Sequence, residues 1–262
     1  MLVDALLELV APTRCAGCER PGALICDTCR QVLTRIDPVH ACVRCGAPFG
    51  DVLCTECRRG GAVGDEAEAE DEAENAGSAA ESAAPPLMEA LERVYACAVF
   101  AGPAPRIIRA YKDAGERRMA DELADMLVEG ARRAQREVPG RYGALLDRAD
   151  AVTFVPATAA AYRRRGFDHM EAIARAVSER AGVPLADVLV KHGASDQRKL
   201  GRQGRLARAQ GLYEVIAPVA GARLLLLDDV ITTGATMDAA ARALRQAGAA
   251  AVDGLAVARV WG

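Results

Sequence analysis

The sequence predicts an α/β protein with a doubly wound, mostly parallel sheet, preceded by a small cysteine-rich module. Two observations predict this: strand-like and helix-like stretches alternate along residues 89–262, and eight of the nine cysteines lie within residues 1–60. Residues 61–88 between them are acidic, rich in Gly, Ala, Ser and Pro, and nearly free of large apolar side chains. Such a segment cannot bury enough surface to fold, so we expect a disordered linker between two modules.

The alternation in residues 89–262 can be assigned element by element. We expect strands at Tyr95–Phe100, Ala151–Val155, Arg223–Leu227 and Ala250–Val260. The helices that we expect are Glu116–Glu137, Asp168–Ala181 and Thr236–Ala247. Strands that alternate with helices favour parallel pairing. The unbroken run of leucines at 224–227 is typical of a central strand that is covered on both faces.

Composition excludes some classes of function and leaves others open. Aromatic residues make up only 4%, which argues against an aromatic platform for single-stranded bases. The net charge of −3 does not by itself favour nucleic acid. No apolar run approaches the roughly 20 residues that cross a bilayer. Residues 1–10 lack a basic start and are expected to form a short amphipathic helix rather than a secretory signal. We therefore expect a cytoplasmic protein with no membrane span.

The cysteines of residues 1–60 predict two zinc sites. They form four Cys-x-x-Cys pairs, which are Cys15 and Cys18, Cys26 and Cys29, Cys42 and Cys45, and Cys54 and Cys57. Two such pairs close a tetrahedral site of four thiolates. Disulfides would need an oxidising compartment, and a redox motif would occur once rather than four times. The similar spacing in the two halves favours sequential pairing, although an interleaved pairing stays open. Sites with four cysteine ligands are structural.

A second pattern indicates a phosphate site after the predicted strand at 223–227. Two aspartates follow that strand, and then a turn rich in Thr and Gly leads into a helix. Ligands of open α/β sheets bind outside the carboxyl ends of strands, and a helix N-terminus favours phosphate. The two carboxylates are suited to a pair of ribose hydroxyls. The candidate residues are Asp228, Asp229, Thr232, Thr233, Gly234, Ala235 and Thr236.

Basic residues elsewhere could neutralise a diphosphate leaving group. The candidates are Lys112, Arg163 and Arg165, and the two arginines belong to an expected basic turn. A solvated role for each arginine is an equally open alternative. The Gly-rich, basic stretch Lys199–Gly211 is expected to be a mobile loop. The histidines, which are His40, His169 and His192, lack the spacing of a catalytic metal site, and we expect them at the surface.

The residues 224–236 resemble the phosphoribosyl-pyrophosphate signature of phosphoribosyltransferases. More narrowly, the chain resembles the ComF family, which has a double zinc ribbon followed by a phosphoribosyltransferase-type domain. Pro156 and Ala157 resemble the family's loop that meets pyrophosphate, and residues 163–169 resemble its Arg-Gly-Phe-Asn-Gln stretch. Asp168 and His169 stand where Asn and Gln are commonest.

The resemblance implies displacement of magnesium-bound pyrophosphate from phosphoribosyl pyrophosphate, with Asp229 as the candidate catalytic residue. It also implies two structural zinc ions and a link to DNA uptake during transformation. The acceptor is left open, because only Trp261 and Gly262 follow the last strand, where relatives that use nucleobases have a base-capping segment. Two alternatives to an enzyme remain. One is a non-catalytic adaptor that uses the zinc ribbons to handle nucleic acid, with single-stranded DNA or a helicase as partner. The other is a sensor of phosphoribosyl pyrophosphate.

Overall fold

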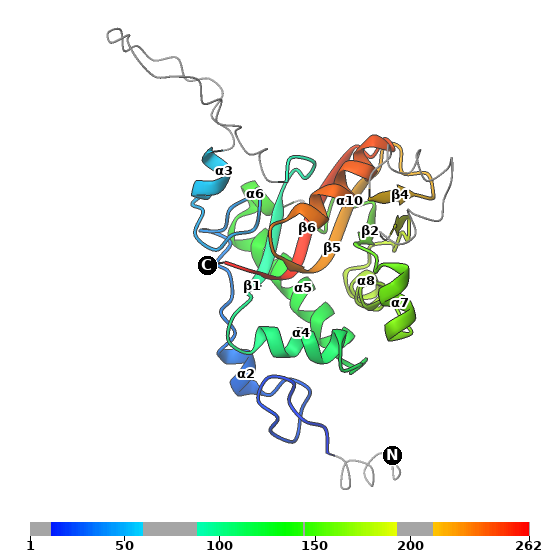
Figure 1. Ribbon diagram of the computed structural model, residues 1–262. Helices are drawn as coiled ribbons and strands as arrows, with labels where there is room; N and C mark the ends of the chain where they lie inside the picture. The colour runs from blue at the N-terminus through cyan, green and yellow to red at the C-terminus, as the bar shows by residue number, and fades with distance from the viewer. Residues whose placement is uncertain (1–11, 60–87, 144, 193–211, 262) are drawn as a thin grey trace, which may run out of the picture.

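A four-stranded parallel sheet lies at the centre of the protein (Figure 1). The computed structural model describes residues 12–59, 88–143, 145–192 and 212–261. The expected N-terminal helix, nearly all of the linker and the loop Lys199–Gly211 therefore lie outside the described residues. The strands are β1 (Val94–Val99), β2 (Ala151–Phe154), β5 (Arg223–Ile231) and β6 (Ala251–Arg259), in the order β1-β6-β5-β2. Each neighbouring pair is parallel, which confirms the predicted fold class.

The winding of the sheet changes direction between β2 and β5. After β2, the chain passes through α8 (His169–Ala181) and returns on the outer side of β2, where Leu185 bridges to Val152 in parallel. After β5, it passes through α10 (Ala235–Gln246) and returns on the opposite side, as β6. The crevice at the carboxyl ends of two such strands is where open α/β sheets bind ligands.

Helices cover the sheet. On one side, α5 (Met119–Glu137) contacts β1 and β6, while α8 contacts β2 and β5 and packs against α5. α5 buries Leu123, Leu127 and Ala131, which are spaced four apart and therefore share one helix face. The shorter helices are α4 (Ala104–Lys112), α6 (Pro139–Tyr142) and α7 (Ala159–Arg165). α10 packs on β5 and β6, and an antiparallel pair of β3 (Leu189–Lys191) and β4 (Tyr213–Val215) lies near its side of the fold (Figure 1).

Two elements differ from the sequence prediction. β5 continues four residues beyond Leu227, because Asp228 and Val230 still pair with β6. The expected basic turn at 163–165 is the last turn of helix α7, which the hydroxyl of Thr158 caps and which ends at Gly166 with φ of +76°. α7 buries no side chain, so it has no apolar periodicity by which the sequence could reveal it.

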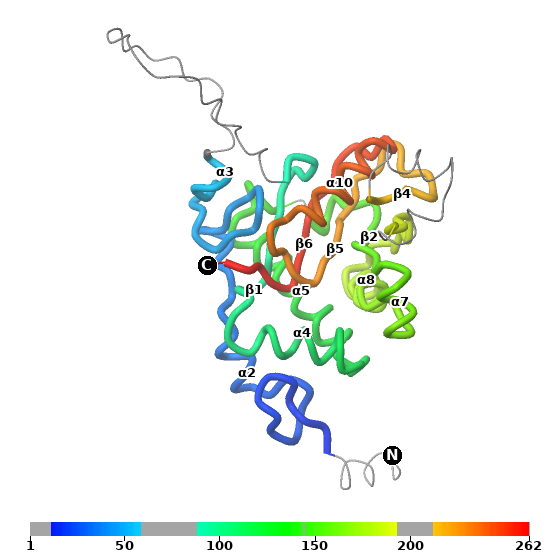
Figure 2. The backbone as a smooth tube through the Cα atoms, viewed as in Figure 1, coloured from blue at the N-terminus to red at the C-terminus, as the bar shows by residue number. Residues whose placement is uncertain are grey.

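The cysteine-rich segment packs along the edge strand β1 (Figure 2). It contains α2 (Asp27–Gln31) in a first cysteine module, residues 12–33, and α3 (Thr55–Arg59) in a second, residues 37–59. The chain between the modules runs antiparallel to β1: the N–H of Ile36 donates to the carbonyl of Cys97, and that of Val99 to the carbonyl of Thr34. This pairing satisfies backbone groups that an open edge would leave exposed.

Gly50 provides a test of how tightly the second module is packed. A Cβ atom at this position would lie 2.6 Å from the Cα of Cys42, too close to backbone for the contact to relax cheaply. We expect Gly50→Ala to lower the free energy of unfolding by about 1–3 kcal/mol, measured by urea denaturation. Gly140→Ala is the matched control, because a Cβ there meets nothing within 4 Å. Equal stability of the two variants would contradict this packing.

Candidate functional site

The candidate site lies where β2 and β5 end side by side. The register pairs Phe154 with Leu227, and the N–H of Val155 then donates to the carbonyl of Leu227 over 2.9 Å. This pairing brings the loop after β2, with Pro156 and Ala157, beside the two aspartates of β5. The two loops that the sequence predicts to bind ligand therefore meet at the crevice where the winding reverses.

The turn from Thr232 to Thr236 leads directly into α10. Its side chains at 232, 233, 235 and 236 are exposed, while Gly234 is buried and adopts φ of +85°. A Cβ at Gly234 would lie 2.5 Å from the sulfur of Met88, so both backbone conformation and space require glycine here. Gly234 is the N-cap residue of α10 and no side chain caps the helix, although the hydroxyl of Thr233 accepts a 3.3 Å bond from the N–H of Ala235. The turn thus offers hydroxyls and a helix N-terminus to solvent.

Asp228 and Asp229 lie at the end of β5 and are only 7% and 4% exposed. Burial raises the pKa of the Asp228 carboxyl well above its usual range, and the charge of Asp229 adds to the rise. Burial also acts to raise the pKa of Asp229, but the hydrogen bond of His169 and the charge of Lys112 outweigh it, so this pKa is lowered. The pair therefore favours one ionised carboxylate, at Asp229, next to one protonated carboxyl.

Two basic side chains from separate helices hold the Asp229 carboxylate. Lys112 at the end of α4 donates from Nζ to Oδ2 over 2.5 Å, and Nε2 of His169 at the start of α8 lies 3.3 Å from the same oxygen. The hydroxyl of Tyr111 donates over 2.5 Å to the carbonyl of His169, which ties the two helix ends together. The expectation that His169 is a surface residue is wrong: it is 6% exposed, because α4 and β5 close over it.

Asp168 connects the loop after β2 to this cluster. Its Oδ2 accepts from the N–H of Ala157 over 2.7 Å, and its Oδ1 caps α8 by accepting from the N–H of Met170. The resemblance marked Asp168 only as a departure from Asn, yet a carboxylate with two acceptor oxygens suits this bridge well.

The predicted arginines separate into two environments. Arg165 turns inward, with a guanidinium nitrogen 3.6 Å from Asp113 and another 3.4 Å from Nδ1 of His169. Arg163, on the same helical turn, is exposed. The structure therefore brings Lys112, Ala157 and Arg165 into one network with Asp229, while Arg163 stands apart from it.

Lys191 is a site residue that the sequence did not single out. It lies on β3, with Nζ 5.3 Å from the centre of the Tyr213 ring. Burial lowers the pKa of Lys191, and the nearby charge of Asp228 opposes this shift. Its position at the end of a three-residue strand carries no distinctive pattern, so only the fold places it near the aspartates.

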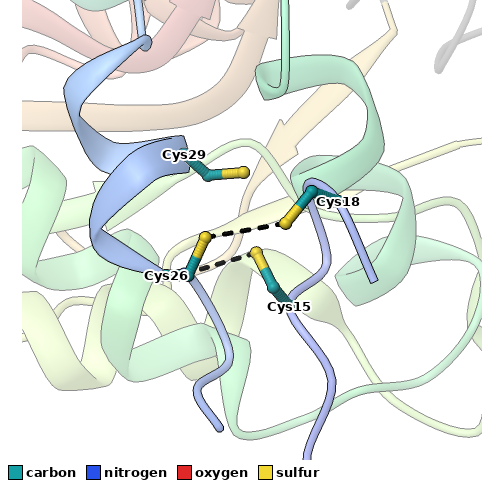
Figure 3. A group of neighbouring side chains, drawn as sticks. All are labelled: Cys15, Cys18, Cys26 and Cys29. Atoms are coloured by element: carbon teal, nitrogen blue, oxygen red, sulfur yellow. Dashed lines mark hydrogen bonds between the residues drawn. The ribbon is translucent and has the colours of Figure 1, made fainter. Parts of the chain in front are cut away.

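The eight paired cysteines gather into two separate clusters. One contains Cys15, Cys18, Cys26 and Cys29, and the other contains Cys42, Cys45, Cys54 and Cys57. Within each cluster all the sulfur atoms lie within 4.8 Å of one another, and Figure 3 shows those of the first cluster turned toward a common centre. The sulfurs of Cys18 and Cys26 are 3.6 Å apart. A tetrahedral zinc site needs sulfurs roughly 3.8 Å apart, given zinc–sulfur bonds of about 2.3 Å. Both clusters fit structural zinc, and the pairing is sequential.

The clusters predict a metal content that can be measured. We expect the purified chain to carry two zinc ions, and Cys57→Ser to carry one, because three remaining ligands bind zinc far more weakly. Inductively coupled plasma mass spectrometry measures the ratio of zinc to protein. Cys97→Ser is the control, since Cys97 is buried in β1 and belongs to neither cluster. Two zinc ions in the Cys57→Ser variant would contradict this ligand assignment.

Within the described residues, no helix is long and apolar enough to cross a membrane. The comparisons with known proteins agree with the geometry. The family model described as "Phosphoribosyl transferase domain" matches residues 163–259, which include the turn at 232–236. A DNA utilization protein, YhgH, from Salmonella typhi is 22% identical over 253 residues, and that from Escherichia coli K12 is 25% identical. Both alignments cover 94% of this chain and 96% of the relative.

Solved structures give a weaker likeness. The allosteric regulatory enzyme of purine biosynthesis aligns with 52% of this chain at 25% identity and a TM-score of 0.31, and this chain covers 25% of that enzyme. The fold, the family match and the two cysteine clusters support one interpretation of the chain without this structural likeness. The phosphoribosyl transferase model thus matches the part of the sheet that contains the turn, the chain also has two four-cysteine clusters, and the resemblance to the ComF family that its sequence indicates is confirmed.

Proposed function

We propose that the protein binds the 5-phosphoribosyl group of phosphoribosyl pyrophosphate, or of a related nucleotide, at residues 228–236. One observation carries the proposal: an exposed turn with three threonines at the N-terminus of α10 begins three residues after the second of two buried aspartates. Helix N–H groups and hydroxyls at 232–236 bind the 5-phosphate, and the carboxyls of Asp228 and Asp229 face the ribose hydroxyls. A protonated carboxyl beside an ionised one can both donate to and accept from a sugar diol.

The diphosphate of the ligand would lie toward the loop after β2. Lys112 and Arg165 already stand around His169 and Asp229, so a diphosphate entering between the two loops meets two cations. Magnesium arrives with the substrate, bound mainly through phosphate oxygens. The Pro156–Ala157 loop is fixed by Asp168, which keeps its backbone in place for this contact. Arg163 would reach the anion only from the exposed side of α7.

The reaction that suits these groups is transfer of the phosphoribosyl group to an acceptor with release of magnesium pyrophosphate. The protein would position the sugar and stabilise the charge that develops on the leaving group. Asp229 is the candidate catalytic residue, because it is ionised and borders the ribose position. Lys112 and His169 keep it ionised and oriented.

A second candidate function rests on the relatives, which are described as DNA utilization proteins. In this alternative, the cysteine modules contact single-stranded DNA or a helicase, and the phosphoribosyl site senses a nucleotide without turnover. The two functions differ in their dependence on salt. Binding of single-stranded DNA falls steeply as salt rises, because each neutralised phosphate releases counterions. Such binding would need the zinc-loaded modules and would survive Asp229→Asn.

Isothermal titration calorimetry with phosphoribosyl pyrophosphate and magnesium tests the proposed site. We expect saturable binding to the wild type and binding about tenfold weaker to Thr233→Ala, because a hydrogen bond to a charged phosphate contributes about 1.5–3 kcal/mol. Thr28→Ala is the matched control, since Thr28 is an exposed threonine of the first module. Absence of binding to the wild type would refute the proposal.

Release of pyrophosphate distinguishes an enzyme from a sensor. In the presence of the correct acceptor class, screened among nucleobases and amines, we expect Asp229→Asn to lower the rate by about 100-fold or more, the size typical of a lost electrostatic contact in a transition state. Asp125→Asn is the control, because its carboxylate pairs with Arg180 on the helical side of the domain. Saturable binding of phosphoribosyl pyrophosphate, with no release of its pyrophosphate in the presence of any acceptor tested, would favour the sensor.

A further inference from the structure

Arg259, the last residue of β6, connects the second cysteine module to the phosphate turn. Its side chain is buried, and the residue is 4% exposed. Nε donates to the carbonyl of Cys45 over 3.1 Å, and Nη1 donates to the carbonyls of Ile231 and Thr232. One rigid guanidinium therefore contacts both a cysteine of the second cluster and the first residue of the turn.

The position of Arg259 follows from the sheet register. β6 pairs with β5 so that Arg259 stands opposite Ile231, where β5 ends and the turn begins. In a trans peptide the C=O and the following N–H point in opposite directions, and the described chain has no cis peptide bond. By holding the carbonyl of Thr232, Arg259 fixes the direction of the N–H of Thr233. That N–H is part of the proposed phosphate cradle.

The charge of Arg259 points to the same connection. Within the part of the chain that the structure describes, Arg259 forms no ion pair with Asp or Glu, and its guanidinium donates to backbone carbonyls, which are those of Cys45, Ile231, Thr232 and Val260. A buried cation without a counter-charge is costly. A zinc ion with four thiolates would have a net charge of −2. A loaded second cluster would therefore bring negative charge to the module that Arg259 contacts through the carbonyl of Cys45.

We propose that Arg259 is a positioning residue that couples metal occupancy of the second cysteine cluster to the geometry of the phosphate turn. When the cluster is loaded, Arg259 is held between the carbonyls of Cys45 and Thr232, and the turn is ordered for a phosphate. When the cluster is empty, the turn loses this support. The consequence for ligand affinity rests on the proposed function, while the coupling itself is a property of the chain.

Among the described residues, the first cluster has no such connection to the turn. Its module contacts the domain through Arg106 of α4, whose guanidinium donates to the carbonyl of Gly17 over 3.0 Å, and through the ion pair of Arg30 with Glu122 of α5. Arg106 is the matched counterpart of Arg259, because each arginine donates to a backbone carbonyl of a cysteine module. Arg106 donates to the carbonyl of Gly17, which lies between two predicted zinc ligands, and Arg259 donates to the carbonyl of the predicted ligand Cys45. Only Arg259 also contacts the phosphate turn. The coupling is therefore expected for the second cluster alone.

Hydrogen–deuterium exchange of the full zinc-loaded chain tests the coupling without any ligand. We expect peptides that cover residues 231–234 to exchange at least tenfold faster in Arg259→Lys, which keeps the charge but loses the planar fork. The same increase is expected in Cys57→Ser, which empties the second cluster. Arg106→Lys should leave this exchange unchanged. Unchanged exchange in Arg259→Lys, or an equal increase in Arg106→Lys, would overturn the proposal, and circular dichroism checks that each variant is folded.

Zinc affinity provides the second measurement, because coupling between two sites is reciprocal in binding free energy. In a competition titration against a chelator, followed with a colorimetric zinc indicator, we expect the second cluster of the wild type to bind zinc about tenfold more tightly when ribose 5-phosphate is saturating. This protection of the zinc should be absent in Arg259→Lys. If ribose 5-phosphate does not bind the wild type at all, the proposed function fails, and the exchange experiment still decides the coupling. Binding without protection would overturn the coupling and leave the proposed function intact.

Discussion

The ionised carboxylate of Asp229 is the interaction on which the rest of the site depends. It is almost fully buried, so it stays charged only because Lys112 and His169 reach it from two different helices. A buried carboxylate without such partners would take up a proton. The ends of α4 and α8 are therefore fixed relative to β5 by charge as well as by packing. Asp168 extends the same network to the loop after β2. The two sides of the crevice are held in place before any ligand arrives, which lowers the entropic cost of binding.

The cysteine modules depend on a different constraint, which is their small size. About twenty residues cannot bury enough apolar surface to fold alone, so each module needs its metal and a surface to pack on. β1 provides that surface for the second module, and α4 and α5 provide it for the first. The edge of β1 pairs with residues 34–36, and the hydroxyl of Tyr95 donates to the carbonyl of Ile36 over 2.7 Å. The sheet in turn gains a covered edge. The cysteine-rich segment and the sheet are thus joined by backbone and side-chain hydrogen bonds as well as by the linker of residues 61–88.

The sequence reveals features whose signals are local. Three such signals are the apolar run before Asp228, the glycine at 234 and the spacing of the cysteines. Each indicates a local structure without reference to the rest of the chain. The sequential cysteine clusters and the parallel sheet that they predict are confirmed. Features that depend on tertiary contacts were missed. His169 and Lys191 reach the aspartates only because other elements fold over them, and α7 has no buried face to produce a periodic pattern. The sequence places Arg259 in a strand, but no neighbouring residue in the sequence shows which groups its side chain contacts.

The placement of Arg259 bears on why a metal module accompanies this domain at all. A structural zinc site that only stabilised a separate ribbon would need no buried arginine between the zinc site and the turn that is proposed to bind phosphate. A buried cation has a desolvation cost, which its hydrogen bonds and a balancing charge must offset. Here the donors hold the carbonyls of Ile231 and Thr232 in the domain and the carbonyl of Cys45 in the second module. Removal of the second module would take away the Cys45 carbonyl and, in the proposed coupling, the balancing charge of a metal-loaded cluster. The second module would therefore act on the proposed phosphate site through Arg259, although it lies about two hundred residues away in sequence.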